Sequence, residues 1–148
     1  MPHVTVERQI NAPIESVFAS IAEPSNFAEA VPAIARIEFL SEQKSGVGTR
    51  FKETRVMRGK EAATELEITE LAPNEHVRIV SDTHGTVWDT IFTVQPIDGG
   101  THLRMVMEAR GYKLVSKVMN PLICKLIGRF VEGDMDAIKT YCESASSS

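Results

Sequence analysis

The chain has 148 residues, of which 43% are hydrophobic and 24% charged, with a formal net charge of −4. This size and composition are typical of one soluble domain with a substantial core. The acidic balance argues against nucleic-acid binding, which needs a basic surface. No stretch approaches the ~18 uninterrupted apolar residues of a membrane span, and the N-terminus lacks the features of a secretion signal. We therefore expect a cytoplasmic protein that is not inserted in a membrane.

The first part of the chain predicts a strand, two short helices and a second strand. Apolar and polar residues alternate over 4–10, which indicates a strand with one buried face, although Arg8 falls on its apolar side. Pro13 and Pro24 each stand where a helix begins, and the two helices carry Phe18 and Phe27. The second strand is predicted over residues 34–40.

A run of antiparallel hairpins is predicted next, with turns at 58–60, 73–74, 84–85 and 98–100. A two-residue turn at 84–85 fixes the register of the strands on either side. It makes Ser81 oppose Trp88, Ile79 oppose Thr90 and Val77 oppose Phe92, and it places Arg78, Asp82 and Asp89 on the outer face. The inner face of the next strand then carries Leu103, Met105 and Met107.

The turn at 58–60 decides whether two charged residues face the interior. A turn of even length places Glu53 and Arg55 on the same face as Leu66, whereas one of odd length places Thr54 and Val56 there instead. A buried charge costs several kcal/mol unless it is paired. An inward Glu53 and Arg55 would therefore form either a structural ion pair, which is the commoner arrangement, or a site for a ligand headgroup.

A long amphipathic helix is predicted from Asn120 to Glu143, with Asn120 as its cap and proline in its first turn. Its predicted apolar face comprises Leu122, Ile123, Leu126, Ile127, Phe130, Ala137, Ile138 and Tyr141. Asp134 lies at the margin of this face and could reach the interior. Cys124 and Cys142 are too far apart along one helix for a disulfide, so we expect them to pack.

The order of these elements resembles the START-like or Bet v 1-like (SRPBCC) superfamily and, within it, the polyketide cyclase/dehydrase group. Matching stretches lie at 10–18, 46–51, 68–74, 99–103 and 135–139. The resemblance implies an α+β helix-grip fold. A curved antiparallel sheet would wrap around the long C-terminal helix, and two short helices would follow the first strand. One domain would span 1–143, followed by a disordered tail at 144–148.

The resemblance also implies a cavity between sheet and helix that binds a hydrophobic or amphipathic molecule, such as a lipid, a polyketide or an aromatic ligand. The alternative is that these side chains simply fill a core. The expected lining comprises Phe51, Glu53, Arg55, Leu66, Ile68, Trp88, Phe92, Met105, Met107, Leu122, Leu126 and Phe130.

Two other functions stay open. A cofactor-independent polyketide cyclase or dehydrase would need proton-transfer groups, for which Glu53, Arg55, Tyr112 and Asp134 are available, although their spacing identifies no catalytic residue. A protein-interaction module would need only an exposed docking face. The four histidines have no ligand spacing, so we expect neither a metal nor a cofactor. No residue pattern favours or excludes a homodimer.

Overall fold

The computed structural model describes residues 3–57, 59–83, 86–111 and 121–146. The side chains of residues 57, 83, 121–126 and 145–146 lie outside that description. No helix in the described part of the chain is both long and apolar enough to cross a bilayer.

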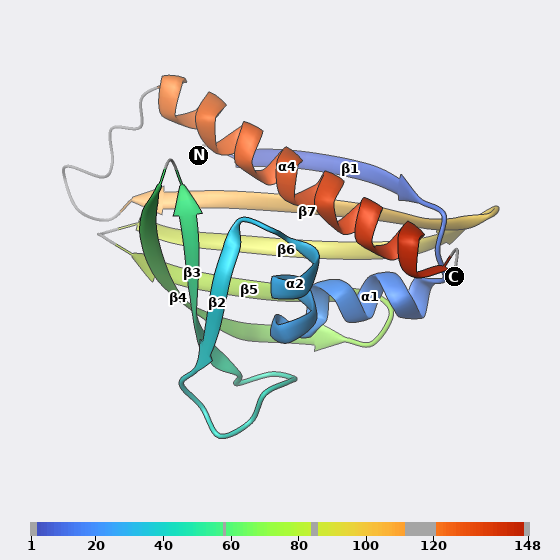
Figure 1. The fold of residues 1–148 in the computed structure, drawn as a ribbon, viewed down its shortest axis with the longest axis horizontal. Coiled ribbons are helices and arrows are strands. Elements are labelled where there is room, and N and C mark those ends of the chain that lie inside the picture. The colour runs from blue at the N-terminus through green and yellow to red at the C-terminus, as the bar shows by residue number, and fades with distance from the viewer. Residues whose placement is uncertain (1–2, 58, 84–85, 112–120, 147–148) are drawn as a thin grey trace.

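Seven antiparallel strands form one sheet in the order β1-β7-β6-β5-β4-β3-β2. The strands are β1 (His3–Ile10), β2 (Ile34–Phe39), β3 (Arg50–Met57), β4 (Lys60–Ala72), β5 (His76–Thr83), β6 (Thr86–Ile97) and β7 (Gly100–Gly111). Two short helices, α1 (Ile14–Ala22) and α2 (Pro24–Ala30), follow β1, and α4 (Pro121–Ser146) closes the chain. Figure 1 shows α1, α2 and α4 on one side of the curved sheet, with α4 crossing it diagonally. The predicted helix-grip fold is confirmed.

Both tight hairpins have an even register, which was predicted for the turn at 84–85 and left open at 58–60. Met57 pairs with Lys60 and Glu53 with Thr64 across β3 and β4. Between β5 and β6, Ser81 pairs with Trp88. Because strand side chains alternate between faces, each short turn fixes which residues of its hairpin face the helices.

The buried face of α4 differs in phase from the predicted one. Val131, Met135, Ile138 and Cys142 are buried, whereas Phe130 is 43% exposed. Ile138 belongs to the predicted face, and Ala137 and Tyr141 of that face are partly buried against the core. Among the described side chains of α4, the fully buried stripe is therefore shifted toward Val131, Met135 and Cys142. Cys142 packs against Ser20, and burial raises the pKa of its thiol. Cys124 was also expected to pack, but its side chain lies outside the described part of the structure.

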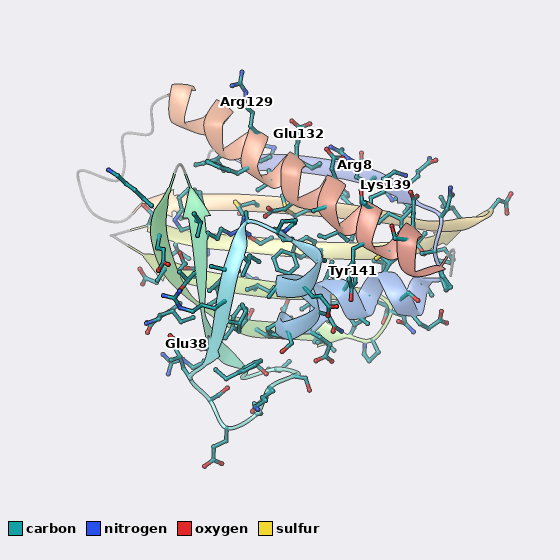
Figure 2. All side chains as sticks on the ribbon, viewed as in Figure 1. Arg8, Glu38, Arg129, Glu132, Lys139 and Tyr141 are labelled. Atoms are coloured by element: carbon teal, nitrogen blue, oxygen red, sulfur yellow. The ribbon has the colours of Figure 1, made fainter. Side chains whose placement is uncertain are left out.

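Polar contacts fasten α4 to the edge strand β1 and account for Arg8. Its Nε donates to Asp136 Oδ1 at 2.7 Å. Lys139 Nζ donates to the carbonyl oxygen of Gln9 at 2.6 Å, and Figure 2 shows both basic residues along the same edge of α4. Glu143 Oε2 accepts from the backbone N–H of Asn11 at 2.9 Å. The helix continues to Ser146, so the predicted disordered tail is helical in its first part.

On the outer face of the sheet, Asp89 is buried beneath two arginines. Its side chain is 6% exposed, and its carboxylate accepts from Arg78 Nε at 2.9 Å and from Arg110 Nη1 at 3.3 Å. Asp89 was predicted to face outward, and it does so beneath the arginine side chains that cover it. Hydrogen bonds from Arg78, and then from Arg110, hold the pKa of this carboxyl below its ordinary value despite its burial.

We predict that Asp89→Asn lowers the free energy of unfolding by about 1–3 kcal/mol at neutral pH, because it removes a buried charge-assisted pair. The folded-state pKa lies below the unfolded-state value of about 3.9, so this stabilisation is present above pH ~4 and is lost as the pH falls through the folded-state pKa. The deficit of the variant should therefore shrink in acid. Urea unfolding of the wild type and of the Asp89→Asn variant across the acid range measures this stability deficit. Glu70→Gln, which alters an exposed partner of Arg78, is the control and should change little.

Gly100 begins β7 in close contact with the end of β1. A Cβ atom at this position would lie 2.1 Å from the carbonyl oxygen of Ile10, so the backbone would have to move. We predict that Gly100→Ala lowers the free energy of unfolding by about 2–4 kcal/mol. Gly128→Ala, where a Cβ meets nothing within 4 Å, should instead stabilise α4 by up to ~1 kcal/mol. Equal losses of stability in the two variants would show that the β1–β7 contact is not responsible.

Candidate ligand-binding pocket

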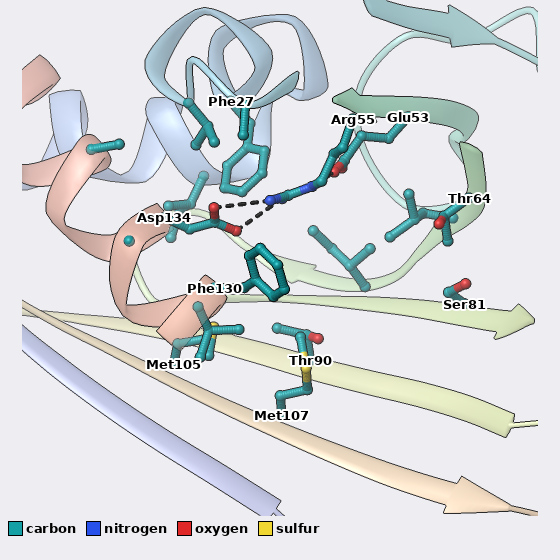
Figure 3. Close-up of a pocket in the computed structure, with 18 of the residues that line it drawn as sticks. Phe27, Glu53, Arg55, Thr64, Ser81, Thr90, Met105, Met107, Phe130 and Asp134 are labelled. Atoms are coloured by element: carbon teal, nitrogen blue, oxygen red, sulfur yellow. Dashed lines mark hydrogen bonds and ion pairs between the residues drawn. The ribbon is translucent and has the colours of Figure 1, made fainter. Parts of the chain in front are cut away.

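A pocket of about 1140 Å³ lies between the helices and the inner face of the sheet. Strands β3 to β7 supply its floor, and α1, α2, the segment after α2 and α4 supply its walls. Its volume lies slightly above the ~300–1000 Å³ typical of small-molecule sites. The lining is mostly apolar, as Figure 3 shows, with a few polar side chains among the aromatic and methionine residues.

Nine of the twelve residues expected to line a cavity do so: Phe51, Glu53, Arg55, Leu66, Trp88, Phe92, Met105, Met107 and Phe130. Ile68 does not. Its side chain is fully buried in the hydrophobic core, and its backbone hydrogen-bonds with Gly48 and Thr49 just before β3. Leu122 and Leu126 lie on α4, but their side chains are outside the described part, as is Tyr112.

The sequence reasoning missed two groups of lining residues. Thr64, Ser81 and Thr90 point inward by the predicted register, but their polarity kept them out of the predicted lining. Phe27 of α2 forms part of the wall and contacts Phe92 edge to face, with ring centroids 6.2 Å apart. Strand parity could have found the hydroxyl residues, whereas the position of Phe27 depends on how α2 packs against the sheet.

Three charged residues meet inside the pocket. Arg55 on β3 donates through Nη1 and Nη2 to the two carboxylate oxygens of Asp134 on α4, at 2.9 and 2.8 Å. Its Nε donates to Glu53, two residues away on the same strand. The side chains of Glu53, Asp134 and Arg55 are 10%, 16% and 21% exposed. We call this group the Glu53–Arg55–Asp134 triad. Figure 3 shows the guanidinium reaching across the pocket to the helix.

The triad holds more negative than positive charge. Burial lowers the pKa of Arg55, but hydrogen bonds and charge from Asp134 and Glu53 outweigh that effect and raise it above its ordinary value. Arg55 therefore stays a cation at any working pH. Two carboxylates and one guanidinium leave a net charge of −1. The inward ion pair considered from the sequence is present, and Asp134 extends it from β3 to α4.

The described lining offers little for covalent or metal chemistry. It contains no histidine and no cysteine, so no nucleophile there is paired with an imidazole base. Among the described residues, no group of His, Cys, Asp and Glu is placed to hold a metal ion. The arrangement suits non-covalent binding: an apolar surface encloses the ligand, and a small polar cluster orients it.

We predict that Arg55→Met lowers the free energy of unfolding by about 2–4 kcal/mol, because it leaves two carboxylates without a counter-ion. A triple variant, Glu53→Leu/Arg55→Met/Asp134→Leu, should recover most of this stability, since it removes the charges together. Urea unfolding measures both. Arg36→Met, which breaks an exposed pair that Arg36 on β2 makes with Glu61 on β4, should have no measurable effect. An Arg55→Met protein as stable as the wild type would show that the triad is not a buried ionic cluster.

Known proteins of similar sequence and structure agree with this geometry. Residues 1–143 match the family described as polyketide cyclase/dehydrase and lipid transport. A START superfamily protein from Mycobacterium smegmatis superposes with a TM-score of 0.79 at 14% identity, covering 97% of this chain and 98% of that one. Ara h 8.0201 superposes with a TM-score of 0.78 at 17% identity, covering 96% of this chain and 97% of that one. The di-domain ARO/CYC protein BexL of the BE-7585A biosynthetic pathway superposes with a TM-score of 0.76 at 15% identity. The match covers 95% of this chain and 46% of BexL.

A search of curated proteins finds no match. At these identities the structural likenesses establish the fold, and the sequence match extends over nearly the whole chain. The chain belongs to the polyketide cyclase/dehydrase and lipid transport family and has its helix-grip fold.

Proposed function

We propose that this protein binds a hydrophobic or amphipathic small molecule in the pocket between the sheet and α4. The observation that carries the proposal is the pocket itself, about 1140 Å³ enclosed by mostly apolar side chains. Protein interiors normally pack to the density of organic crystals, so a solvent-accessible space of this size beneath the helices leaves room for a bound molecule. The family description, which includes lipid transport, supports the same assignment.

The chemistry of the walls suits a ligand with a substantial apolar body. Phe51, Trp88 and Phe92 offer flat aromatic surfaces, and the thioether side chains of Met105 and Met107 adapt to irregular shapes. Phe130 on α4 borders the pocket while remaining 43% exposed, so it marks a side on which the pocket meets solvent. A ligand could enter there without unfolding the sheet.

A cofactor-independent polyketide cyclase is the second candidate. It is favoured by the carboxylates of Glu53 and Asp134 inside the pocket and by the fold shared with the ARO/CYC protein BexL. Both carboxylates are hydrogen-bonded to Arg55, so a proton-transfer role would require substrate to displace that contact. Binding requires no such rearrangement, and we therefore place it first. An interaction module is less well supported, because it gives the pocket no role.

We predict that wild-type protein purified gently and examined by native mass spectrometry carries a small molecule that denaturation releases. Thr90→Phe should lose that molecule, because Thr90 lies on the pocket floor and the added ring occupies the space. Thr93→Phe is the matched control. Thr93 lies on the same strand with opposite parity and pairs with Arg104 on the outer face, so this variant should retain the molecule.

Both variants should first be shown to unfold cooperatively in urea. Equal retention by both would place the binding site elsewhere on the protein. A wild-type chain that stays unliganded and takes up no fatty acid, sterol or aromatic polyketide would refute the proposal.

A further inference from the structure

We propose that the Glu53–Arg55–Asp134 triad selects ligands whose polar head donates hydrogen bonds and carries no negative charge, such as an alcohol or an amine, and rejects carboxylates. The inference rests on the proposed binding function and specifies the class of ligand. An arginine in an apolar pocket would ordinarily indicate an anionic ligand. Here the guanidinium is already paired with two carboxylates of the protein itself.

The charge balance of the pocket argues against an anion. The triad carries a net charge of −1, and its side chains are mostly shielded from water. Repulsion between like charges weakens with distance and dielectric, so it is stronger in such a site than in bulk solvent. An incoming carboxylate would meet this repulsion and would lose its own hydration, whereas an alcohol or an amine would not be repelled.

The hydrogen-bonding inventory leads to the same conclusion. Ionised carboxylates only accept hydrogen bonds, and the two together offer about eight lone-pair sites. Arg55 fills three of these through Nε, Nη1 and Nη2. Only two of the ~5 N–H donors of its guanidinium are left outside these contacts. The triad therefore offers many more acceptor sites than donors, and a ligand that supplies donors complements it.

The other polar groups of the described lining do not reverse this balance. Glu53, Arg55 and Asp134 share the described lining with one further charged residue, Arg129. Arg129 is exposed, and Figure 2 shows its side chain pointing away from the sheet, so solvent screens its charge. Thr64, Ser81 and Thr90 are neutral. Among the described lining residues, the charge that a buried headgroup meets is therefore set by the triad.

The test compares decanol, decylamine and decanoate, which share one apolar tail and differ in the head. Binding is measured at neutral pH and fixed ionic strength by the fluorescence of Trp88, the single tryptophan and a pocket residue, and by calorimetry. We expect decanol and decylamine to bind, and decanoate to bind at least about tenfold more weakly than decanol.

Two substitutions on the same helix separate the pocket from the overall charge of the protein. Asp134→Asn makes the triad neutral and should reduce the discrimination against decanoate about tenfold. Asp136→Asn changes the net charge equally, but at an exposed residue that pairs with Arg8 outside the pocket, and it should leave the discrimination unchanged. Glu53→Gln neutralises the triad from β3 and replaces Asp134→Asn if that protein does not fold.

Each alternative result has a distinct meaning. Decanoate binding as tightly as decanol would overturn this inference and leave the proposed function standing. Equal effects of Asp134→Asn and Asp136→Asn would also overturn it, because the discrimination would then come from the net charge of the protein. No binding by any of the three compounds would count against the proposed function, and the inference would fall with it.

Discussion

The need to pair charges inside an apolar pocket shapes much of this structure. Arg55 cannot lose its proton, so its burial requires a counter-ion, and Asp134 supplies one from the other side of the cavity. This ion pair joins β3 to α4 across the pocket. At the far edge of the sheet, Arg8 joins β1 to α4 through Asp136. Ion pairs from β1 and β3 thus connect α4 to both halves of the sheet, with the pocket between them.

Such an arrangement explains how an interior space can persist. The buried residues of α4, Val131, Met135 and Ile138, pack in the core, while Asp134 is held on the pocket side by Arg55. A purely hydrophobic interface would gain stability by closing the space, because atoms that line an empty cavity lack van der Waals partners on one side. Directional pairs at fixed positions oppose that collapse. The same triad that supports the walls also sets the polarity that a ligand meets.

The sequence predicted the strands and the register of the 84–85 hairpin, because a two-residue turn determines parity and parity determines the face. It left two registers open at the 58–60 turn, and the structure selects the even one, which turns Glu53 and Arg55 inward. The sequence also placed Asp134 at the border of the α4 face. Most of the expected pocket residues lie on the strands, where the same parity rule predicts which side chains face the pocket. Ile68 is the exception: its face was predicted correctly, but its side chain is fully buried in the core and does not line the pocket.

The remaining features depend on tertiary packing. The phase of α4 placed Val131 and Met135 inward and left Phe130 at the pocket border. Helical periodicity alone allows a broad stripe, and only packing against the sheet selects the part that is buried. The partner of Arg55 and the contribution of Phe27 depend likewise on how the helices cross the sheet. No local pattern encodes those angles.

An NMR titration of the isotope-labelled protein with decanol tests most directly whether the pocket is the binding site. We expect the indole N–H of Trp88 and the amides of β6, β7 and the middle of α4 to shift together and saturate. The amides around Arg78 and Arg110 on the outer face should stay in place. Shifts confined to the outer face, or none at saturation, would contradict an internal binding site.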